Sequence, residues 1–156
     1  MSNQPVKPTK SLPSSIKKIE VGEFHVIHDG SPGGHPGYVV WKDDLLNIYL
    51  LVKVGSSPNK NNEKLNTKLS EKVESHYYYK RPFLAKRKDI GTNPVTFLSP
   101  TEEFKEIAER LKTVDPLESK SIKRKDRYNF KKLQKNRPKT GVPLVKGNCP
   151  ANNGPA

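Results

Sequence analysis

The sequence is poor in the residues that build disulfides, thiolate metal clusters and membrane spans. Its 156 residues include one cysteine, Cys149, so an intrachain disulfide and a metal cluster held by several thiolates are both excluded. No apolar run reaches the roughly 20 residues that a membrane helix needs. The first residues also lack the apolar segment of a signal peptide. We therefore expect a soluble, cytoplasmic protein without a membrane partner.

Apolar and acidic residues are scarce as well. Hydrophobic residues make up 32% of the chain and 14 residues are proline, so part of the chain cannot be packed into a core. Lysine and arginine number 29 against 16 aspartates and glutamates, which gives a formal net charge of +13. Clustered cations gain binding free energy by displacing the counterions around phosphates. Nucleic acid is therefore the first candidate partner, and an anionic membrane surface is the second.

Local composition divides the chain into four segments. Residues 1–18 are predicted to form a disordered basic arm, because their Pro, Ser, Thr and Lys cannot bury enough apolar area to offset the entropy of ordering. Residues 19–114 are predicted to form the folded domain. Residues 115–140 form a basic segment, helical or extended, and residues 141–156 have the composition of a disordered tail. Between Pro116 and Lys146, eleven basic residues stand against two acidic ones, with aromatic residues among them.

A strand, a glycine-rich loop and a second strand are predicted near the start of the domain. Residues 19–28 alternate apolar and polar side chains with one irregularity at Gly22, as expected of a half-buried strand. His25 is expected on the solvent face of that strand. Residues 29–37 are rich in glycine and proline, which permit tight turns and close approach to a ligand. Residues 38–41 resume a strand with β-branched and aromatic side chains.

The middle of the domain is predicted to contain its most buried strand. After a polar turn at residues 42–44, residues 45–54 form a nearly continuous apolar run. Residues 58–75 are polar and fit either a short helix or an irregular excursion. Residues 76–85 are rich in strand-forming residues and contain a proline suited to an edge or a bulge. A turn is expected at residues 92–94.

The best-specified helix is predicted over residues 100–112. Ser99 is a natural N-cap, Pro100 fits the first helical position, and Glu102 completes a capping box. The residues at positions i, i+3, i+4 and i+7 then form one apolar face that suits docking on a sheet. These residues are Phe104, Ile107, Ala108 and Leu111.

The order of several short motifs gives a further indication of the fold. The motifs are Gly22-Glu23 with Val26 and Ile27, then His35-Pro36 with Val39-Val40, then Ser56-Ser57 after Leu50-Leu51-Val52. Together with the segment 76–91 and the helix at 99–111, this order resembles the MazF/PemK family of toxin endoribonucleases, in particular its divergent PemK-like members. The resemblance covers roughly residues 20–112.

The resemblance implies an α+β fold with a small SH3-like β-barrel and a C-terminal helix, to which the composition adds basic, partly disordered termini. It also implies a homodimer that cleaves single-stranded RNA without a metal or another cofactor. The expected protein partner is a cognate antitoxin that covers the positive groove. In that family an arginine before the proline and a threonine or serine after the buried strand serve the chemistry. Here the first position holds His35 and the second holds Ser56 or Ser57.

The residues themselves fit this chemistry. Metal-independent RNA cleavage needs a base for the 2′-hydroxyl proton, an acid for the leaving 5′-oxygen, and donors around the phosphorane. His35 suits either proton transfer, and Ser56 or Ser57 would polarise the phosphate. Arg81 with Lys53 would neutralise its charge. In the alternative interpretation, His35 is a loop histidine held by a backbone carbonyl and the two serines belong to an ordinary turn.

The remaining candidates are RNA contacts. They are histidines that approach a phosphate or stack on a base, a stacking tyrosine, and basic side chains for phosphates: His28, His76, Tyr78, Lys53, Lys80, Lys86, Arg87 and Lys88. Each also has an ordinary interpretation as a strand end, a packed ring or a solvated charge. The histidines do not form a metal-binding pattern, because His25 and His28 do not share a strand face and no second cluster follows.

The sequence therefore predicts a metal-independent endoribonuclease, the toxin of a toxin-antitoxin system, that cleaves single-stranded RNA. The alternative is a non-catalytic nucleic-acid-binding module with the same fold, in which phosphates and stacked tyrosines hold the ligand and His35 is structural. A third possibility is an accessory protein recognised by a protein partner through its basic tail. The first two differ on whether His35 and a serine hydroxyl converge in a basic, open groove.

Overall fold

The computed structural model describes residues 18–135 of the chain. The predicted arm over residues 1–18, apart from Lys18, and the predicted tail over residues 141–156, which contains Cys149, lie outside these residues. The chain divides into two compact units, Met1–Ile122 and Lys123–Ala156, and each is described by itself.

The described part of the first unit is an α+β structure built on one eight-stranded sheet. Its elements in chain order are β1 (Phe24–Ile27), β2 (His35–Asp43), β3 (Ile48–Gly55), β4 (Asn62–Lys64), β5 (Tyr77–Tyr79), β6 (Phe83–Lys86), the 3₁₀ helix η1 (Arg87–Asp89), β7 (Ile90–Pro94), α1 (Glu102–Leu111) and β8 (Leu117–Glu118).

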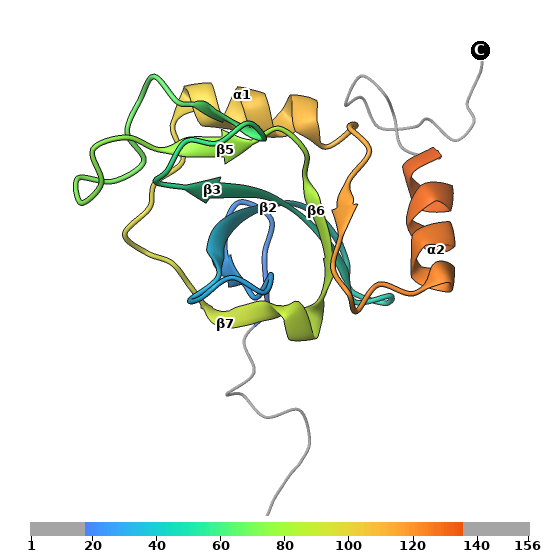
Figure 1. Ribbon diagram of the computed structural model, residues 1–156. Coiled ribbons are helices and arrows are strands. Elements are labelled where there is room, and N and C mark those ends of the chain that lie inside the picture. The colour runs from blue at the N-terminus through green and yellow to red at the C-terminus, as the bar shows by residue number, and fades with distance from the viewer. Residues whose placement is uncertain (1–17, 136–156) are drawn as a thin grey trace, which may run out of the picture. The chain divides into compact units, whose positions relative to one another are not determined.

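The strands follow the order β4-β5-β3-β2-β1-β7, and β6 pairs with both β3 and β8. All pairs are antiparallel except β6 with β8, which run parallel. The sheet curves around the centre of the unit (Figure 1). Over the described residues it does not close into a barrel, because β7 and β4 pair with no further strand beyond them.

The first two strands differ in length from their predicted ranges. The strand predicted over residues 19–28 shortens to β1, because Gly22 adopts a left-handed φ of 97° in a turn that precedes Phe24. In contrast, β2 begins at His35, where it pairs with Ile27, so the predicted glycine-rich loop ends three residues early. The catalytic candidate therefore starts a strand.

The predicted burial of the third strand is confirmed, but its start is later. Every residue of β3 from Ile48 to Val54 is buried. The preceding turn lies at residues 44–47 and not at 42–44: Leu45 is 96% exposed, and Asn47 has a left-handed φ of 56°. The only regular element in residues 58–75 is the short strand β4. Residues 92–94 belong to β7, so the turn expected there is wrong.

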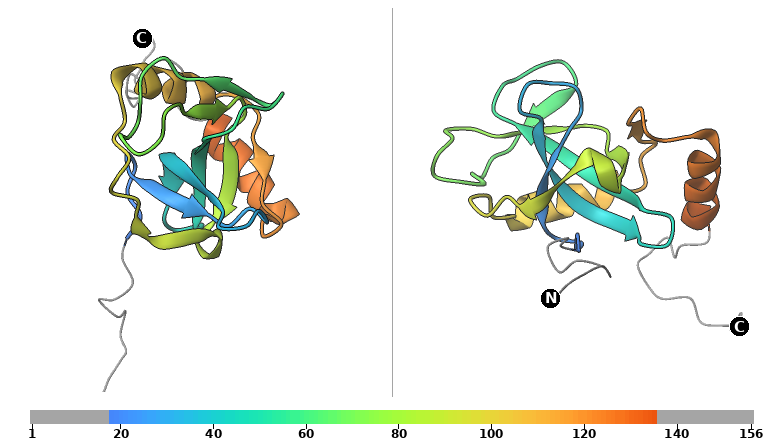
Figure 2. Two further views of the ribbon diagram at one scale, coloured as in Figure 1. Left: turned by 60° about the vertical axis from the view of Figure 1, so that its left-hand side comes forward. Right: turned by 90° about the horizontal axis from the view of Figure 1, so that it is seen from below.

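The core lies between the curved strands and α1. One buried cluster joins the sheet strands: Ile19, Ile27, Val39, Tyr49, Leu51, Phe83, Ala85 and Ile90. The predicted apolar face of α1 is confirmed, since all four of its residues are buried. The Phe104 ring lies 5.6 Å from the Phe24 ring and 5.2 Å from the Tyr38 ring. Figure 2 shows α1 at one end of the unit and β7 at the other.

The helix α1 begins later than predicted, because a different residue is its N-cap. Thr101, not Ser99, is the N-cap, because the Thr101 hydroxyl accepts a hydrogen bond from the Phe104 backbone N–H at 3.2 Å. Pro100 consequently lies before the helix. In the second unit, α2 (Arg124–Lys135) begins where Asp126 accepts a hydrogen bond from the Lys123 N–H at 2.9 Å. Of the helices described, none is long and apolar enough to cross a bilayer.

Candidate active site

The backbone around His35 is set by the short connection between β1 and β2. The connection must reverse the chain within residues 28–34, and it does so through glycines with left-handed φ. Gly34 has a φ of 69°, and a Cβ on it would clash with the Ile27 carbonyl oxygen. Glycine at this position therefore lets the chain turn directly into β2, where the His35 ring lies next to Gly55 at the end of β3.

Asp29 is the centre of a buried hydrogen-bond network in this connection. Its side chain is 5% exposed. The Ser31 hydroxyl and backbone N–H donate to Oδ1 at 2.6 and 3.2 Å. His35 Nδ1 and Lys53 Nζ approach Oδ2 at 2.8 and 2.9 Å. Burial alone would raise the pKa of Asp29, but the hydrogen bonds from Ser31, Lys53 and His35 outweigh it and hold that pKa far below its usual value.

An ionised Asp29 determines the tautomer of His35. A carboxylate only accepts hydrogen bonds, so Nδ1 of His35 must carry the hydrogen in the 2.8 Å contact. In the neutral ring, Nε2 is then the lone-pair nitrogen. The Tyr79 hydroxyl lies 3.3 Å from Nε2 and donates to it, and the two rings meet edge to face with centroids 5.5 Å apart. His35 thus presents an oriented base.

Lys53 is held inside the network. Its side chain is 10% exposed and forms an ion pair with Asp29. The ammonium also lies over two aromatic rings, 4.5 Å from the centroid of Tyr79 and 4.9 Å from that of Phe83. Because these contacts surround the ammonium group, the positive charge of Lys53 neutralises the negative charge of Asp29 inside the protein.

A pocket of about 410 Å³ opens beside His35 and is called the His35 pocket below. It brings together three predicted site residues with His35, namely Ser56, Ser57 and His76. Its full lining is Gly34, His35, Pro36, Val54, Gly55, Ser56, Ser57, Asn59, Val73, His76, Tyr79, Phe97 and Leu98. A Cβ on Gly55 would lie 3.5 Å from the His35 ring, so the glycine keeps this side of the imidazole uncrowded.

Arg81 lies outside the His35 pocket. It lines a different pocket with Lys80, and that pocket shares Tyr79 with the first. The guanidinium donates to the Asp115 carbonyl at 3.0 Å, to the Asp115 carboxylate at 3.2 Å and to the Pro116 carbonyl at 3.1 Å. The structure therefore uses Arg81 to hold the segment before β8, and not to face the His35 ring.

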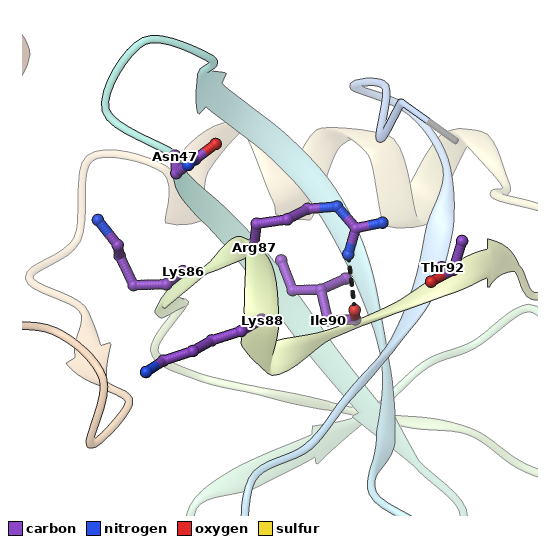
Figure 3. A pocket seen from close by; sticks show the side chains of 6 residues that line it. All are labelled: Asn47, Lys86, Arg87, Lys88, Ile90 and Thr92. Atoms are coloured by element: carbon purple, nitrogen blue, oxygen red, sulfur yellow. Dashed lines mark hydrogen bonds between the residues drawn. The ribbon is translucent and has the colours of Figure 1, made fainter. Parts of the chain in front are cut away.

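The predicted basic contacts Lys86, Arg87 and Lys88 line a third pocket, of about 620 Å³, called the Lys88 pocket below. Asn47, Ile90 and Thr92 complete its lining. The side chains of Lys86 and Lys88 extend to one side, whereas Arg87 extends toward Ile90 (Figure 3). The Arg87 guanidinium donates to the Ile90 carbonyl and the Lys86 ammonium to the Leu46 carbonyl, both at 3.0 Å.

Tyr78, His28 and His25 do not line the His35 pocket. Tyr78 donates to Glu63 at 2.7 Å, and burial together with this hydrogen bond raises the pKa of Tyr78 to about 12. His28 is exposed at the end of β1. His25 is fully buried, so its expected surface position is wrong. Its two ring nitrogens face the Gly91 carbonyl at 2.9 Å and the Glu23 carboxylate at 2.8 Å.

Sequence reasoning missed Asp29, Ser31 and Tyr79. The spacing of Asp29 and Ser31 before His35 in a glycine-rich connection was a usable signal, because a tight hairpin returns its second strand beside the start of the loop. Tyr79 gave no such signal, since its position depends on pairing between β5 and β3.

The arrangement supplies an acid or base, hydroxyl donors and an apolar wall. Ser31 is not a nucleophile activated by Nε2, because its hydroxyl lies on the Nδ1 side of His35 at 3.1 Å. Within residues 18–135, no group of three or more His, Cys, Asp or Glu side chains is placed to hold a metal ion.

No protein-family model, curated protein or solved structure matches the chain. The function is therefore inferred from the site.

Proposed function

We propose that this chain is a metal-independent endoribonuclease that cleaves single-stranded RNA in the His35 pocket, a toxin of the MazF/PemK type with an SH3-like core. The observation that carries the proposal is the buried Asp29 carboxylate on Nδ1 of His35, which leaves Nε2 as a base in a pocket with two serine residues. A homodimer and an antitoxin with an acidic segment belong to the same proposal, and the net charge of +13 suits both RNA and such a segment.

In the proposed reaction, the ribose 2′-hydroxyl displaces the Tyr79 hydroxyl from Nε2 of His35 and gives up its proton there. The 2′-oxygen bonds to phosphorus while the bond from phosphorus to the 5′-oxygen breaks. The products are a 2′,3′-cyclic phosphate and a 5′-hydroxyl, whose oxygen takes its proton from a water molecule, and the imidazolium of His35 then returns its proton to water. Asp29 stabilises the imidazolium that forms, and the Ser56 or Ser57 hydroxyl donates to the phosphate oxygens.

One observation favours a second function. The Tyr79 hydroxyl already donates to Nε2 at 3.3 Å, which satisfies His35 without a substrate. In a non-catalytic nucleic-acid-binding module, this bond would persist and the pocket would only hold a nucleotide. Such a module would bind RNA in a salt-sensitive way without cutting it.

The deciding experiment is incubation of a long single-stranded RNA with the purified protein in EDTA, beside His35→Ala. We expect the wild type to cut and the variant to be slower by about 100-fold or more, the range typical of a lost general base. The ends should be 2′,3′-cyclic phosphates and 5′-hydroxyls. Thermal unfolding of both proteins checks that the variant is folded. Tight binding without cutting by either protein would select the binding module.

A further inference from the structure

His76 is a second histidine of the His35 pocket, and its setting differs from that of His35. It immediately precedes β5 and is 4% exposed. Its backbone carbonyl accepts a hydrogen bond from the Leu65 N–H at 2.8 Å. The Leu69 N–H donates to Nδ1 of the ring at 3.4 Å. The loop between β4 and β5 thus holds both the backbone and the ring of His76.

These contacts determine which ring nitrogen can donate. A backbone N–H only donates, so Nδ1 of His76 uses its lone pair in the contact with Leu69 and Nε2 carries the hydrogen. Burial lowers the pKa of His76, which favours the neutral ring. Among residues 18–135, no group accepts a hydrogen bond from this Nε2–H. The pocket therefore contains a lone-pair Nε2 on His35 and an N–H donor on His76.

The rest of the pocket wall suits a flat, apolar ring. Five apolar side chains line it together with His76, namely Pro36, Val54, Val73, Phe97 and Leu98. The Phe97 ring is 48% exposed, and the Lys72 ammonium lies 5.0 Å from its centroid. Single-stranded RNA is recognised by stacking of unpaired bases on such rings and by hydrogen bonds to the base edges. The pocket combines both features.

We infer that His76 is a specificity-determining residue whose Nε2–H donates a hydrogen bond to an acceptor on a nucleobase held against Phe97. This inference rests on the proposed function for its substrate class, single-stranded RNA. A base that covers this donor with a donor or an apolar edge of its own is disfavoured, because the Nε2–H then loses water without gaining a hydrogen bond. His76 consequently selects the base, whereas His35 moves the proton.

The first test needs no catalysis. Nucleoside 3′-monophosphates of the four bases have no internucleotide bond to cleave, so each is titrated into the wild-type protein while the histidine side-chain nitrogens are followed by NMR. We expect the free protein to show the Nε2–H tautomer at His76, and at least one nucleotide to shift that signal saturably. Inorganic phosphate should leave it unchanged. An Nδ1–H tautomer, or a signal that no nucleotide moves, would overturn the inference.

The second test measures base preference at the cleavage site. His76→Phe keeps a flat ring and removes the donor, while His76→Gln restores an N–H donor. Tyr77→Phe, which alters the adjacent residue outside the pocket lining, is the matched control. We expect cutting by all three, with preference between bases at least 10-fold weaker in His76→Phe, partly restored in His76→Gln and unchanged in the control.

The outcomes separate the two proposals. If the wild type cuts RNA and His76→Phe keeps the full preference, the role of His76 is wrong and the nuclease stands. If the wild type does not cut but a nucleotide shifts the His76 signal, base recognition stands and the nuclease fails.

Discussion

The Asp29 network beside the His35 pocket and the Lys88 pocket both contain basic side chains, but they hold them differently. In the first, Lys53 is 10% exposed and its charge is balanced by a carboxylate that is 5% exposed. In the second, Lys86 and Arg87 donate to backbone carbonyls, and Lys88 is exposed beside them (Figure 3). No carboxylate lines the described walls of the Lys88 pocket.

The difference teaches which kind of task each region suits. Charges removed from water interact strongly, and they require close partners in good geometry. Such a network can orient one imidazole nitrogen toward a reacting proton. An exposed cation such as Lys88 is screened by salt and does not depend on a buried partner, which suits attraction of a polyanion without regard to its sequence.

The largest expected effect is that of Asp29→Asn, which removes the charge of the buried pair and replaces one of the two acceptor oxygens that hold Ser31, His35 and Lys53 by an NH2 group. We expect a loss of about 3 kcal/mol in the free energy of unfolding, because Lys53 is left buried and unpaired. RNA cleavage should fall by about 100-fold as His35 loses its orientation. Urea titration and cleavage rates measure the two effects.

The control for this substitution is Asp44→Asn. Asp44 pairs with Lys42 at 3.2 Å, but its side chain is 46% exposed, so the change should stay below about 1 kcal/mol. Equal destabilisation by the two substitutions would show that burial does not distinguish the Asp29 network.

The pH dependence of the unfolding free energy is a second test of the Asp29 network. The folded-state pKa of Asp29 is depressed below the unfolded value of 3.8, so its contribution to stability is fully present above that pH. The contribution is lost as the pH falls through 3.8 toward the folded-state pKa, because the unfolded chain then binds the proton first. Urea titrations across the acid range should show a steeper loss for the wild type than for Asp29→Asn. Parallel curves would contradict the assignment.

A smaller effect is expected from glycine substitutions beside the two pockets. Gly34→Ala combines a left-handed φ of 69° with a clash on the Ile27 carbonyl, so we expect a cost of about 2 kcal/mol. Gly91→Ala, between two residues of the Lys88 pocket, meets Val26 at an ordinary 3.5 Å and should cost less than about 1 kcal/mol. Urea titration of both variants tests the difference, and similar costs would show that the hairpin is not tightly constrained.

The salt dependence of RNA binding distinguishes the exposed Lys88 from the buried Lys53, which is paired with Asp29. Lys88→Ala should reduce the slope of log affinity against log salt by about 0.7, as for one lost phosphate contact on a single strand. Lys53→Met should leave the slope unchanged, because the ammonium is paired with Asp29. Filter binding at several salt concentrations measures both. A reduced slope for Lys53→Met would mean that Lys53 reaches a phosphate.

The smallest effect is expected from Tyr79→Phe. The change removes one hydrogen bond to Nε2 of His35 and keeps the ring under Lys53, so the unfolding free energy should fall by less than about 1 kcal/mol. Cleavage should persist, because the 2′-hydroxyl replaces the tyrosine hydroxyl in the proposed reaction. Loss of cleavage in a folded Tyr79→Phe protein would make the hydroxyl a catalytic group.

Much of the local structure could be predicted because its causes are close in the chain. The apolar face of α1 and the burial of β3 follow from spacing and composition, and both are confirmed. Errors arose where neighbouring residues compete for one role. Ser99 and Thr101 both suit an N-cap, and the structure selects Thr101. Residues 19–28 alternate correctly for a strand, yet a turn at Gly22 interrupts them.

The sequence by itself determined the α+β composition, the excess of positive charge and the choice of His35, Ser56, Ser57 and His76 as candidates. Only the tertiary structure decided that these four line one pocket while Arg81 lines another. It also decided that Lys53 serves Asp29, 24 residues earlier in the chain. The hydrophobic periodicity of a sequence indicates which face of a helix or strand is buried, but it does not indicate which strands pair or in what register. Those pairings set the partners, and therefore the tautomers, of His35 and His76.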